Sequence, residues 1–174
     1  MVAALGVAAC GAGGPPADAG PPPSREQIWT AILPQADRYR IDPGFVFALV
    51  AAESNFDPRA QNGQARGLMQ IKPAAWADVS NTPYETGVWD WRTNLEVGID
   101  YLAYCRAELH RKSNFTYPLL LASFHYGFDF VERRRFDIGR IPIPENDIYR
   151  RLWRGDLTPV APPGSAKPLE TDSQ

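Results

Sequence analysis

Residues 45–53 have the sequence FVFALVAAE, in which one carboxylate directly follows eight apolar residues. Asp42 and Pro43 precede this stretch as a helix cap and a first-turn proline, so the sequence predicts an apolar helix that runs to about Ala52. A helix without a polar face must be buried over most of its surface. Its last turn therefore places Glu53 at the edge of the core, where burial and the negative end of the helix dipole both disfavour the ionised carboxylate.

Glu53 is the candidate catalytic residue that follows from this placement. A carboxyl group that stays protonated near neutral pH can donate its proton to a substrate oxygen, as a general acid does. The same pattern also fits a solvent-facing residue at the end of a helix. Asp57 is the nearest candidate for a partner carboxylate, but the Pro58 that follows it favours a role in a turn.

A loop follows Glu53 and is expected to return toward it. Residues 54–58 (SNFDP) leave the helix, and Gly63 and Gly67 permit tight backbone turns before the apolar stretch GLMQI at 67–71. A loop of this kind can fold back over the helix end. The sequence therefore predicts a cleft beside Glu53.

Helix signals dominate the rest of the chain, and no run of alternating apolar and polar residues indicates a sheet of any size. The expected fold class is mainly α, with little or no sheet. Cys105 falls in the middle of a long helix, where we expect a buried small hydrophobic residue. The further helices are predicted from a capping box at Ser24 and Gln27, from Lys72 and Pro73 through Val79, from a second capping box at Thr93 and Glu96, from Pro118 through about Tyr126, and from Ile143 to Trp153.

The composition fits one domain and argues against a nucleic acid partner. Of the 174 residues, 44% are hydrophobic and 22% are charged, which is enough for one core. The formal net charge of -2 lacks the basic footprint of a nucleic acid-binding protein, and the cluster Arg133, Arg134 and Arg135 is interpreted as a solvated helix face. His110 and His125 belong to no metal-binding spacing, so neither a metal nor another cofactor is expected.

The two ends of the chain differ in composition from its middle. Residues 1–10 form an apolar segment, too short to span a bilayer, that ends in Val-Ala-Ala-Cys10 and resembles the bacterial lipobox, whose cysteine is acylated. We therefore expect an exported protein of the periplasm, anchored in the membrane as a lipoprotein through Cys10. Residues 11–23 are the expected Pro/Gly/Ala linker, residues 24–157 the domain and residues 158–174 a disordered tail.

Ordered motifs between Ile41 and Trp153 resemble those of the soluble lytic transglycosylase family. These enzymes have a goose-type lysozyme fold and act on bacterial cell walls, so the resemblance implies that fold here. The loop between the first two motifs is one residue shorter than the usual family spacing, and contacts of its tip are not carried over. The motifs are ES at 53–54, ARGLMQI at 65–71, NLEVGIDYL at 94–102, SFHYG at 123–127 and ENDIY at 145–149.

The resemblance implies a reaction and the residues that perform it. Glu53 would be the single catalytic carboxylate in cleavage of the β-1,4 bond between N-acetylmuramic acid and N-acetylglucosamine. The 6-hydroxyl of the muramic sugar attacks its own C1 and leaves a 1,6-anhydro end, without the second carboxylate that ordinary glycosidases use. The residues implied to bind the substrate or border the sugar cleft are Ser54, Met69, Gln70, Phe124, His125 and Tyr149, with the Tyr149 hydroxyl near Glu53.

Two of these positions depart from the family pattern. Phe124 stands where the family usually has a tyrosine, and it lacks that hydroxyl. His125 replaces an asparagine; it can still donate a hydrogen bond, and its change of charge near neutral pH is one route to a pH-sensitive activity. The other interpretation of His125 is a helix-end residue that tolerates the exchange.

Two alternative functions stay open at this point. A hydrolytic muramidase of the same fold needs the same acid. A non-catalytic envelope protein that binds glycan strands is the other alternative, although a carboxylate in the apolar setting of Glu53 argues against pure binding. In each case the partner is peptidoglycan and a monomer is expected. For an enzyme, the small size favours cleavage within strands over cleavage from their ends.

Overall fold

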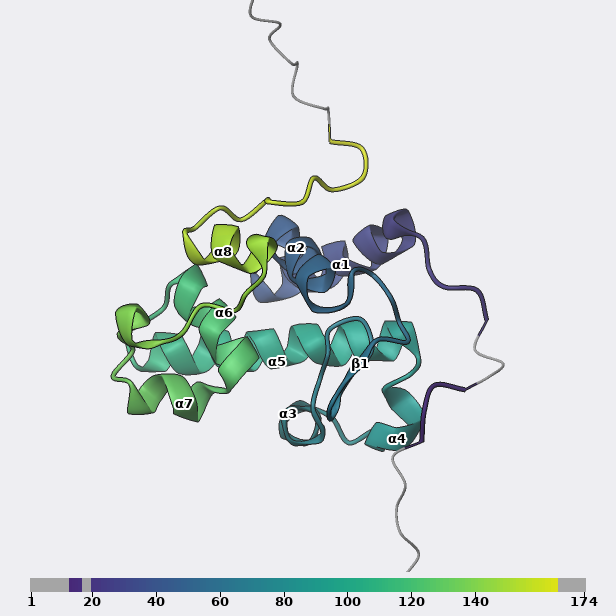
Figure 1. The fold of residues 1–174 in the computed structure, drawn as a ribbon, viewed down its shortest axis with the longest axis horizontal. Helices are drawn as coiled ribbons and strands as arrows, with labels where there is room; N and C mark the ends of the chain where they lie inside the picture. Colours follow the sequence, from purple (N-terminus) through teal and green to yellow (C-terminus); the bar gives the residue numbers. More distant parts are fainter. Residues whose placement is uncertain (1–12, 17–19, 166–174) are drawn as a thin grey trace, which may run out of the picture.

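Eight α-helices and one short hairpin make up most of the secondary structure that the computed structural model describes, over residues 13–16 and 20–165 (Figure 1). The mainly α fold class is confirmed. Cys10 lies outside the described residues. In chain order the elements are α1 (Arg25–Tyr39), α2 (Pro43–Ser54), β1 (Gln61–Asn62), β2 (Ala65–Arg66), α3 (Pro73–Val79), α4 (Tyr84–Gly87), α5 (Trp91–Arg111), α6 (Tyr117–Tyr126), α7 (Phe128–Arg133), the 3-10 helix η1 (Ile138–Arg140) and α8 (Asp147–Trp153).

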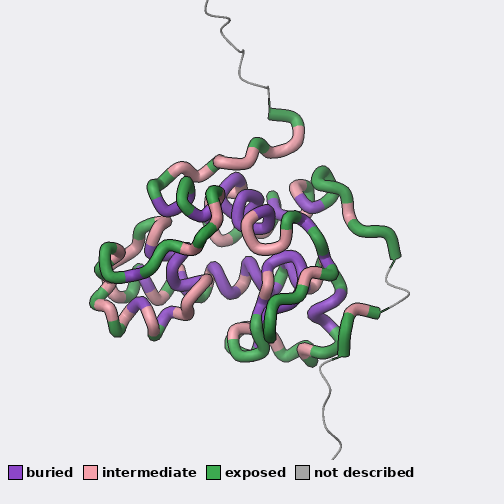
Figure 2. Tube along the Cα trace, viewed as in Figure 1, coloured by how far each residue is buried: buried purple, intermediate pink, exposed green. Residues whose placement is uncertain are grey.

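Helix α2 is buried, as its composition predicts. All residues from 44 to 51 are buried, and the helix contacts both α1 and α8. The Asp42 carboxylate accepts a hydrogen bond from the Phe45 backbone N–H at 3.0 Å, which confirms the predicted cap. Asn55 then adopts the left-handed conformation, with φ of 51°, and ends the helix at Ser54. Figure 2 shows the buried residues gathered along α2 and α5.

Helix α5 supplies many of the buried core residues and begins earlier than predicted. Asp90 is its cap, and the Asp90 carboxylate accepts hydrogen bonds from the backbone N–H and the hydroxyl of Thr93 at 2.8 and 2.7 Å. The predicted capping box at Thr93 and Glu96 is therefore wrong, because Asp90 already holds the cap position and Thr93 lies inside the first turn. Cys105 is fully buried in this helix, as expected.

The GLMQI stretch is attached to α5 by one buried side chain, that of Asn94. Its amide nitrogen donates to the carbonyl oxygens of Arg66 at 3.0 Å and Val88 at 3.1 Å, and its amide oxygen accepts from the Met69 backbone N–H at 2.9 Å. Gly67 has φ of +78°, and a Cβ atom there would lie 2.2 Å from the Asn94 amide nitrogen. The close approach of this turn to α5 therefore requires a glycine.

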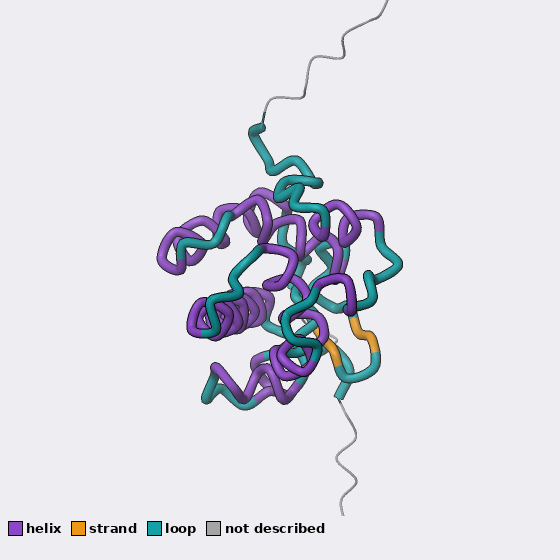
Figure 3. The backbone as a smooth tube through the Cα atoms, turned by 90° about the vertical axis from the view of Figure 1, so that its left-hand side faces the viewer, coloured by secondary structure: helices purple, strands orange, loops and turns teal. Residues whose placement is uncertain are grey.

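Strands β1 and β2 form the only hairpin among the described residues and are drawn in orange in Figure 3. The strands are antiparallel, with Gln61 opposite Arg66 and Asn62 opposite Ala65. The Gly67 backbone N–H donates to the Ala60 carbonyl at 2.9 Å and closes the loop. The loop after Glu53 thus returns, as predicted.

The last helix begins later than predicted. Asn146 caps α8 by accepting from the backbone N–H groups of Ile148 and Tyr149, so the helix spans residues 147–153 and the prediction of a start at Ile143 is wrong. Pro144 interrupts the helical pattern just after Ile143, and Ile143 is exposed. The short helices α4, α7 and η1 were missed, since each is too short to show a periodic pattern.

Part of the segment predicted as a disordered tail contacts the domain. The Pro159 carbonyl accepts a hydrogen bond from the Arg151 guanidinium at 2.9 Å, and Val160 packs against the core. These contacts concern residues 158–165 only. None of the described helices is both long enough and apolar enough to cross a membrane.

Candidate active site

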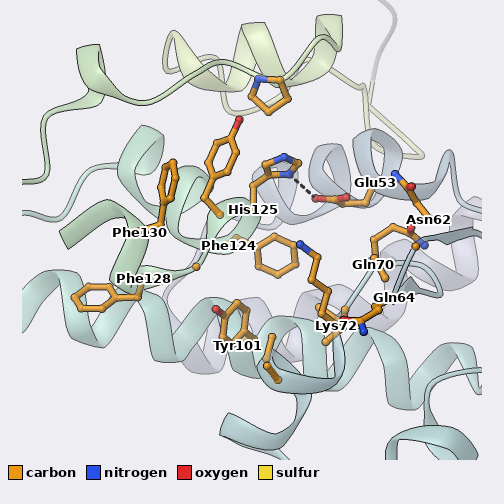
Figure 4. Close-up of a pocket in the computed structure, with 18 of the residues that line it drawn as sticks. Glu53, Asn62, Gln64, Gln70, Lys72, Tyr101, Phe124, His125, Phe128 and Phe130 are labelled. Carbon is orange, nitrogen blue, oxygen red and sulfur yellow. Dashed lines mark ion pairs between the residues drawn. The ribbon is translucent and has the colours of Figure 1, made fainter. Parts of the chain in front are cut away.

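A cleft of about 1010 Å³ lies beside the end of α2 (Figure 4). The hairpin and the start of α3 line one part of it, and α6, α7 and the loop before α8 line another. Helix α5 contributes Tyr101 and Tyr104. The cleft predicted beside Glu53 is therefore present, and Glu53 lines it.

Glu53 reaches the cleft from the last turn of α2, with its side chain 12% exposed. The Tyr149 hydroxyl donates a hydrogen bond to Glu53 Oε1. His125 Nδ1 lies 3.7 Å from the same oxygen and 3.1 Å from the Tyr149 hydroxyl, and Figure 4 draws the first of these contacts. Because the single phenolic proton goes to Glu53, His125 Nδ1 is the donor to Tyr149. The three side chains form one hydrogen-bonded chain that ends on the carboxylate.

Tyr149 is held in place for this contact. It is 2% exposed on α8, and burial, followed by the charge of Glu53 and the hydrogen bond to it, raises the pKa of Tyr149 well above the ordinary tyrosine value. The hydroxyl therefore stays protonated and remains a donor. Asn146, the cap of α8, also donates to the Ala52 carbonyl at 3.4 Å and so joins the start of α8 to the end of α2.

The second carboxylate oxygen of Glu53 has no hydrogen-bond partner among the described residues, whereas Oε1 is occupied by Tyr149. Oε2 can therefore hold a proton and present it to a molecule in the cleft. This arrangement suits a general acid, in which one oxygen is fixed and the other reacts.

No second carboxylate accompanies Glu53 among its described partners, which are Tyr149 and His125. Asp57 instead accepts a hydrogen bond from the Arg59 backbone N–H at 2.8 Å and does not line the cleft, in agreement with the predicted turn role. The other carboxylates of the cleft come from different elements: Asp78 from α3, Asp129 from α7 and Glu145 from the loop before α8.

The residues that the resemblance implied divide into two groups. Gln70, Phe124, His125 and Tyr149 line the cleft with Glu53. The Gln70 amide nitrogen donates to the carbonyl oxygens of Ala60 and Gly67 at 2.9 and 3.0 Å, which leaves its amide oxygen without a described partner. Phe124, nearly buried, packs against Tyr101 with ring centroids 5.8 Å apart, so it forms an apolar wall.

Ser54 and Met69 do not line the cleft. The Ser54 hydroxyl donates to the Val50 carbonyl within α2 at 3.1 Å. Met69 is fully buried against Gly98, where a Cβ atom would lie 2.3 Å from the Met69 sulfur. Each is the chain neighbour of a residue that lines the cleft, Glu53 and Gln70 respectively.

Several residues that line the cleft were not predicted from the sequence to do so. Lys72 appeared only as the start of a helix, yet its side chain extends into the cavity beside Phe124 (Figure 4). Arg133 also lines the cleft, and it is exposed, as expected of a residue on a solvated helix face. Arg134 packs its guanidinium over the Phe130 ring at 3.3 Å, and Arg135 is exposed. In the described part of the chain, no group of three or more His, Cys, Asp or Glu side chains could hold a metal ion.

Comparison with known proteins identifies one family, whose model covers most of the residues of this site. A family model described as the Transglycosylase SLT domain matches residues 30–136, which include Glu53 and His125 but end before Tyr149. The chain is also 28% identical over 106 residues to the membrane-bound lytic murein transglycosylase E of Buchnera aphidicola subsp. Acyrthosiphon pisum. That alignment covers 54% of this chain and 48% of the relative, so the chain spans about half the length of the curated relative it matches.

Proposed function

Because the chain belongs to the Transglycosylase SLT domain family, we propose that it is a lytic transglycosylase that cleaves the glycan strands of peptidoglycan. The observation that carries the proposal is the placement of Glu53, a carboxyl group with one oxygen held by Tyr149 and the other open to a cleft of about 1010 Å³. The name of the Buchnera relative, a murein transglycosylase, supports the same substrate class.

In the proposed reaction, Glu53 acts first as acid and then as base on the β-1,4 bond between N-acetylmuramic acid and N-acetylglucosamine. Oε2 donates its proton to the glycosidic oxygen, the bond from C1 to that oxygen breaks, and the N-acetylglucosamine end leaves with the proton. The muramic 6-hydroxyl then forms a bond to C1 and gives its proton back to Glu53. One C–O bond replaces another and no water is consumed, so the product is a 1,6-anhydro end.

Tyr149 and His125 hold the carboxyl group in this scheme. Tyr149 fixes Oε1, and His125 in turn donates to the Tyr149 hydroxyl from 3.1 Å. Gln70 and Phe124 are the proposed substrate contacts. Gln70 would accept a hydrogen bond through its amide oxygen, since its amide nitrogen is already bound to the backbone, and Phe124 would contact a sugar through its ring. Ser54 and Met69 act indirectly, since neither lines the cleft.

Analysis of the digestion products tests the proposed reaction against its alternative. Purified peptidoglycan is digested with the protein, and the fragments are examined by mass spectrometry. Anhydro ends have one water less than hydrolytic ends, and they are the expected product. A digest that contains only reducing ends makes the protein a hydrolytic muramidase instead.

Substitution of Glu53 separates an enzyme from a protein that only binds glycan strands. Glu53→Gln keeps the shape and the hydrogen bond to Tyr149 but removes the acid. We expect it to bind peptidoglycan and to lose at least a hundredfold in lytic rate, about the contribution of general acid–base catalysis. A Glu53→Gln protein that lyses as fast as the wild type refutes the proposed role of Glu53, and a wild type that binds without lysis supports the binding alternative.

The proposed location is the periplasmic side of the membrane, with a lipid anchor on Cys10. The lipobox-like residues 7–10 support the anchor, and the relative is named as membrane-bound. A monomer is the proposed state. Labelling of cells with radioactive palmitate tests the anchor: the wild type is expected to carry label and Cys10→Ser to carry none, while label that persists in Cys10→Ser refutes the anchor.

A further inference from the structure

Residues 156–160, here named the strap, follow α8 and lie against the domain. In Figure 1 they continue in yellow from α8 and pass above α2. Leu157 and Val160 are partly buried and pack against the core, whereas the exposed Thr158 places its methyl group beside Gly44. A Cβ atom at Gly44 would lie only 2.5 Å from that methyl carbon and 3.6 Å from the Leu157 carbonyl oxygen. The strap therefore contacts the first turn of α2.

Arg151 joins the strap to α8. Its Nε donates to the Asp156 carboxylate at 2.8 Å, its Nη2 lies 2.6 Å from the same oxygen, and its Nη1 donates to the Pro159 carbonyl at 2.9 Å. Asp156 also accepts a hydrogen bond from the Thr158 backbone N–H at 3.2 Å. An exposed ion pair alone contributes only about 0–1 kcal/mol. Arg151, however, bonds to two points of the strap, and one of these points also fixes the turn of the strap.

Helix α8 is thus attached to α2 near both of its ends. Before α8 begins, Asn146 donates to the Ala52 carbonyl at the end of α2, and after α8 ends, the strap contacts Gly44 at the start of α2. The two helices are in contact, and these attachments show that they run in opposite directions. Tyr149 lies in α8 between the two attachments, with its hydroxyl on Glu53.

We propose that the strap is a positioning element of the active site, an inference that rests on the proposed function. The strap holds α8 on α2 and so keeps the Tyr149 hydroxyl on Glu53. Helix α8 has 7 residues, too few for a helix to be stable by itself. Burial of Leu152 and Trp153 draws it to the core, but the hydrophobic effect is non-directional, so the polar contacts near its two ends fix where Tyr149 lies. The family model ends before α8 and covers neither this helix nor the strap.

The first experiment needs no substrate. Amide hydrogen exchange in α8 is measured by mass spectrometry for the wild type, Arg151→Gln and Arg150→Gln. Arg150 is the matched control, because it is also an exposed arginine of α8 paired with an aspartate, but its partner Asp147 lies within the same helix. Arg151→Gln is expected to speed exchange in α8 about fivefold and to leave α5 unchanged, and Arg150→Gln to change α8 by less than about twofold. Equal exchange rates of α8 in the two variants overturn the proposal.

The second experiment asks whether the strap acts through Tyr149. Arg151→Gln is expected to lower kcat for the lysis of peptidoglycan about threefold in the wild type, and by less than about 1.5-fold in Tyr149→Phe, which has no hydroxyl to hold. Leu157→Ser weakens the apolar contact of the strap instead and is expected to show the same dependence on Tyr149.

A strap that only stabilises the fold slows the wild type and Tyr149→Phe by the same factor. That result, or no loss in either protein, overturns the proposal, and circular dichroism checks that each variant is folded. A wild type that does not lyse peptidoglycan refutes the proposed function instead, and the exchange experiment still decides whether the strap holds α8.

Discussion

Tyr149 on α8 donates a hydrogen bond to Glu53 at the end of α2, although 96 residues separate the two in the sequence. Removal of the hydroxyl by Tyr149→Phe leaves the ring and its packing in place but frees Glu53 Oε1. We expect the lytic rate to fall about a hundredfold, the usual effect of one lost preorganised donor in an active site. Stability is expected to change by only about 1 kcal/mol.

Tyr117→Phe is the control for this loss. The Tyr117 hydroxyl accepts a hydrogen bond from the Asp42 backbone N–H at 2.8 Å and does not line the cleft. It is expected to lower the melting temperature by a few degrees and to leave the lytic rate unchanged. Equal rates for Tyr149→Phe and wild type contradict the role given to Tyr149.

His125 is expected to contribute to lysis as the donor that holds the Tyr149 hydroxyl. Its Nδ1 lies 3.1 Å from that hydroxyl and 3.7 Å from Glu53 Oε1. Loss of this donor should loosen Tyr149 and, through it, the hold on Glu53. The groups that face His125 are Glu53 from α2, Tyr149 from α8 and Tyr126 on its own helix.

His125→Asn and His125→Ala test this role, because the amide of asparagine can still donate to Tyr149 and alanine cannot. We expect His125→Asn to keep most of the lytic activity and His125→Ala to be about tenfold slower. Equal rates of lysis for the two variants speak against the prediction.

Gly67 and Gly63 offer a paired test of how the GLMQI stretch docks. Both have positive φ, at +78° and +59°, but only at Gly67 does an added Cβ meet the Asn94 side chain. Gly67→Ala is expected to lower the free energy of unfolding by about 3 kcal/mol, from backbone strain and overpacking together. Gly63→Ala should cost about 1 kcal/mol. Urea denaturation measures both, and equal losses rule out the contact with Asn94 as the cause.

Cys105 predicts a loss of stability at alkaline pH. Burial raises the pKa of the Cys105 thiol from 9.0 to about 12, while the unfolded chain ionises it near its ordinary value. The folded state therefore holds more protons than the unfolded state between these values, and stability falls as the pH rises from about 9. The slope is about 1.4 kcal/mol per pH unit for one group.

Cys105→Ala removes this contribution and should flatten the curve of unfolding free energy between pH 9 and 10, measured under reducing conditions. Above pH 10 buried tyrosines add the same effect in both proteins, since burial raises the pKa of Tyr84 to about 12. An equally steep fall in Cys105→Ala between pH 9 and 10 contradicts the assignment to the thiol.

The parts of the fold that could be predicted from the sequence are those with local causes. Helix α2 and its cap follow from Asp42, Pro43 and an apolar run, and the same run leaves Glu53 at the edge of the core. The cap of α5 was predicted wrongly because two capping patterns lie three residues apart and only Asp90 has the right place in the fold.

The candidate site was predictable only in part, because its members come together through long-range packing. Tyr149 was expected near Glu53 from the family resemblance alone, since nothing local marks it. Lys72 and Arg133 carry no pattern that distinguishes a charge in a cleft from one on the outer surface, and both were missed. Met69 is apolar and borders a glycine-rich turn, and the sequence does not reveal whether it faces the cleft or the core.

The contact between Asn146 and the Ala52 carbonyl makes the orientation of the acid depend on the last helix. Helix α8 holds Tyr149, and the loop before it supplies Pro144, Glu145 and Asn146 to the wall of the cleft. A local opening that releases α8 from α2 therefore removes both the donor to Glu53 and one part of the cleft, while Glu53 stays at the end of α2. The geometry of the site is thus only as stable as the docking of this short helix.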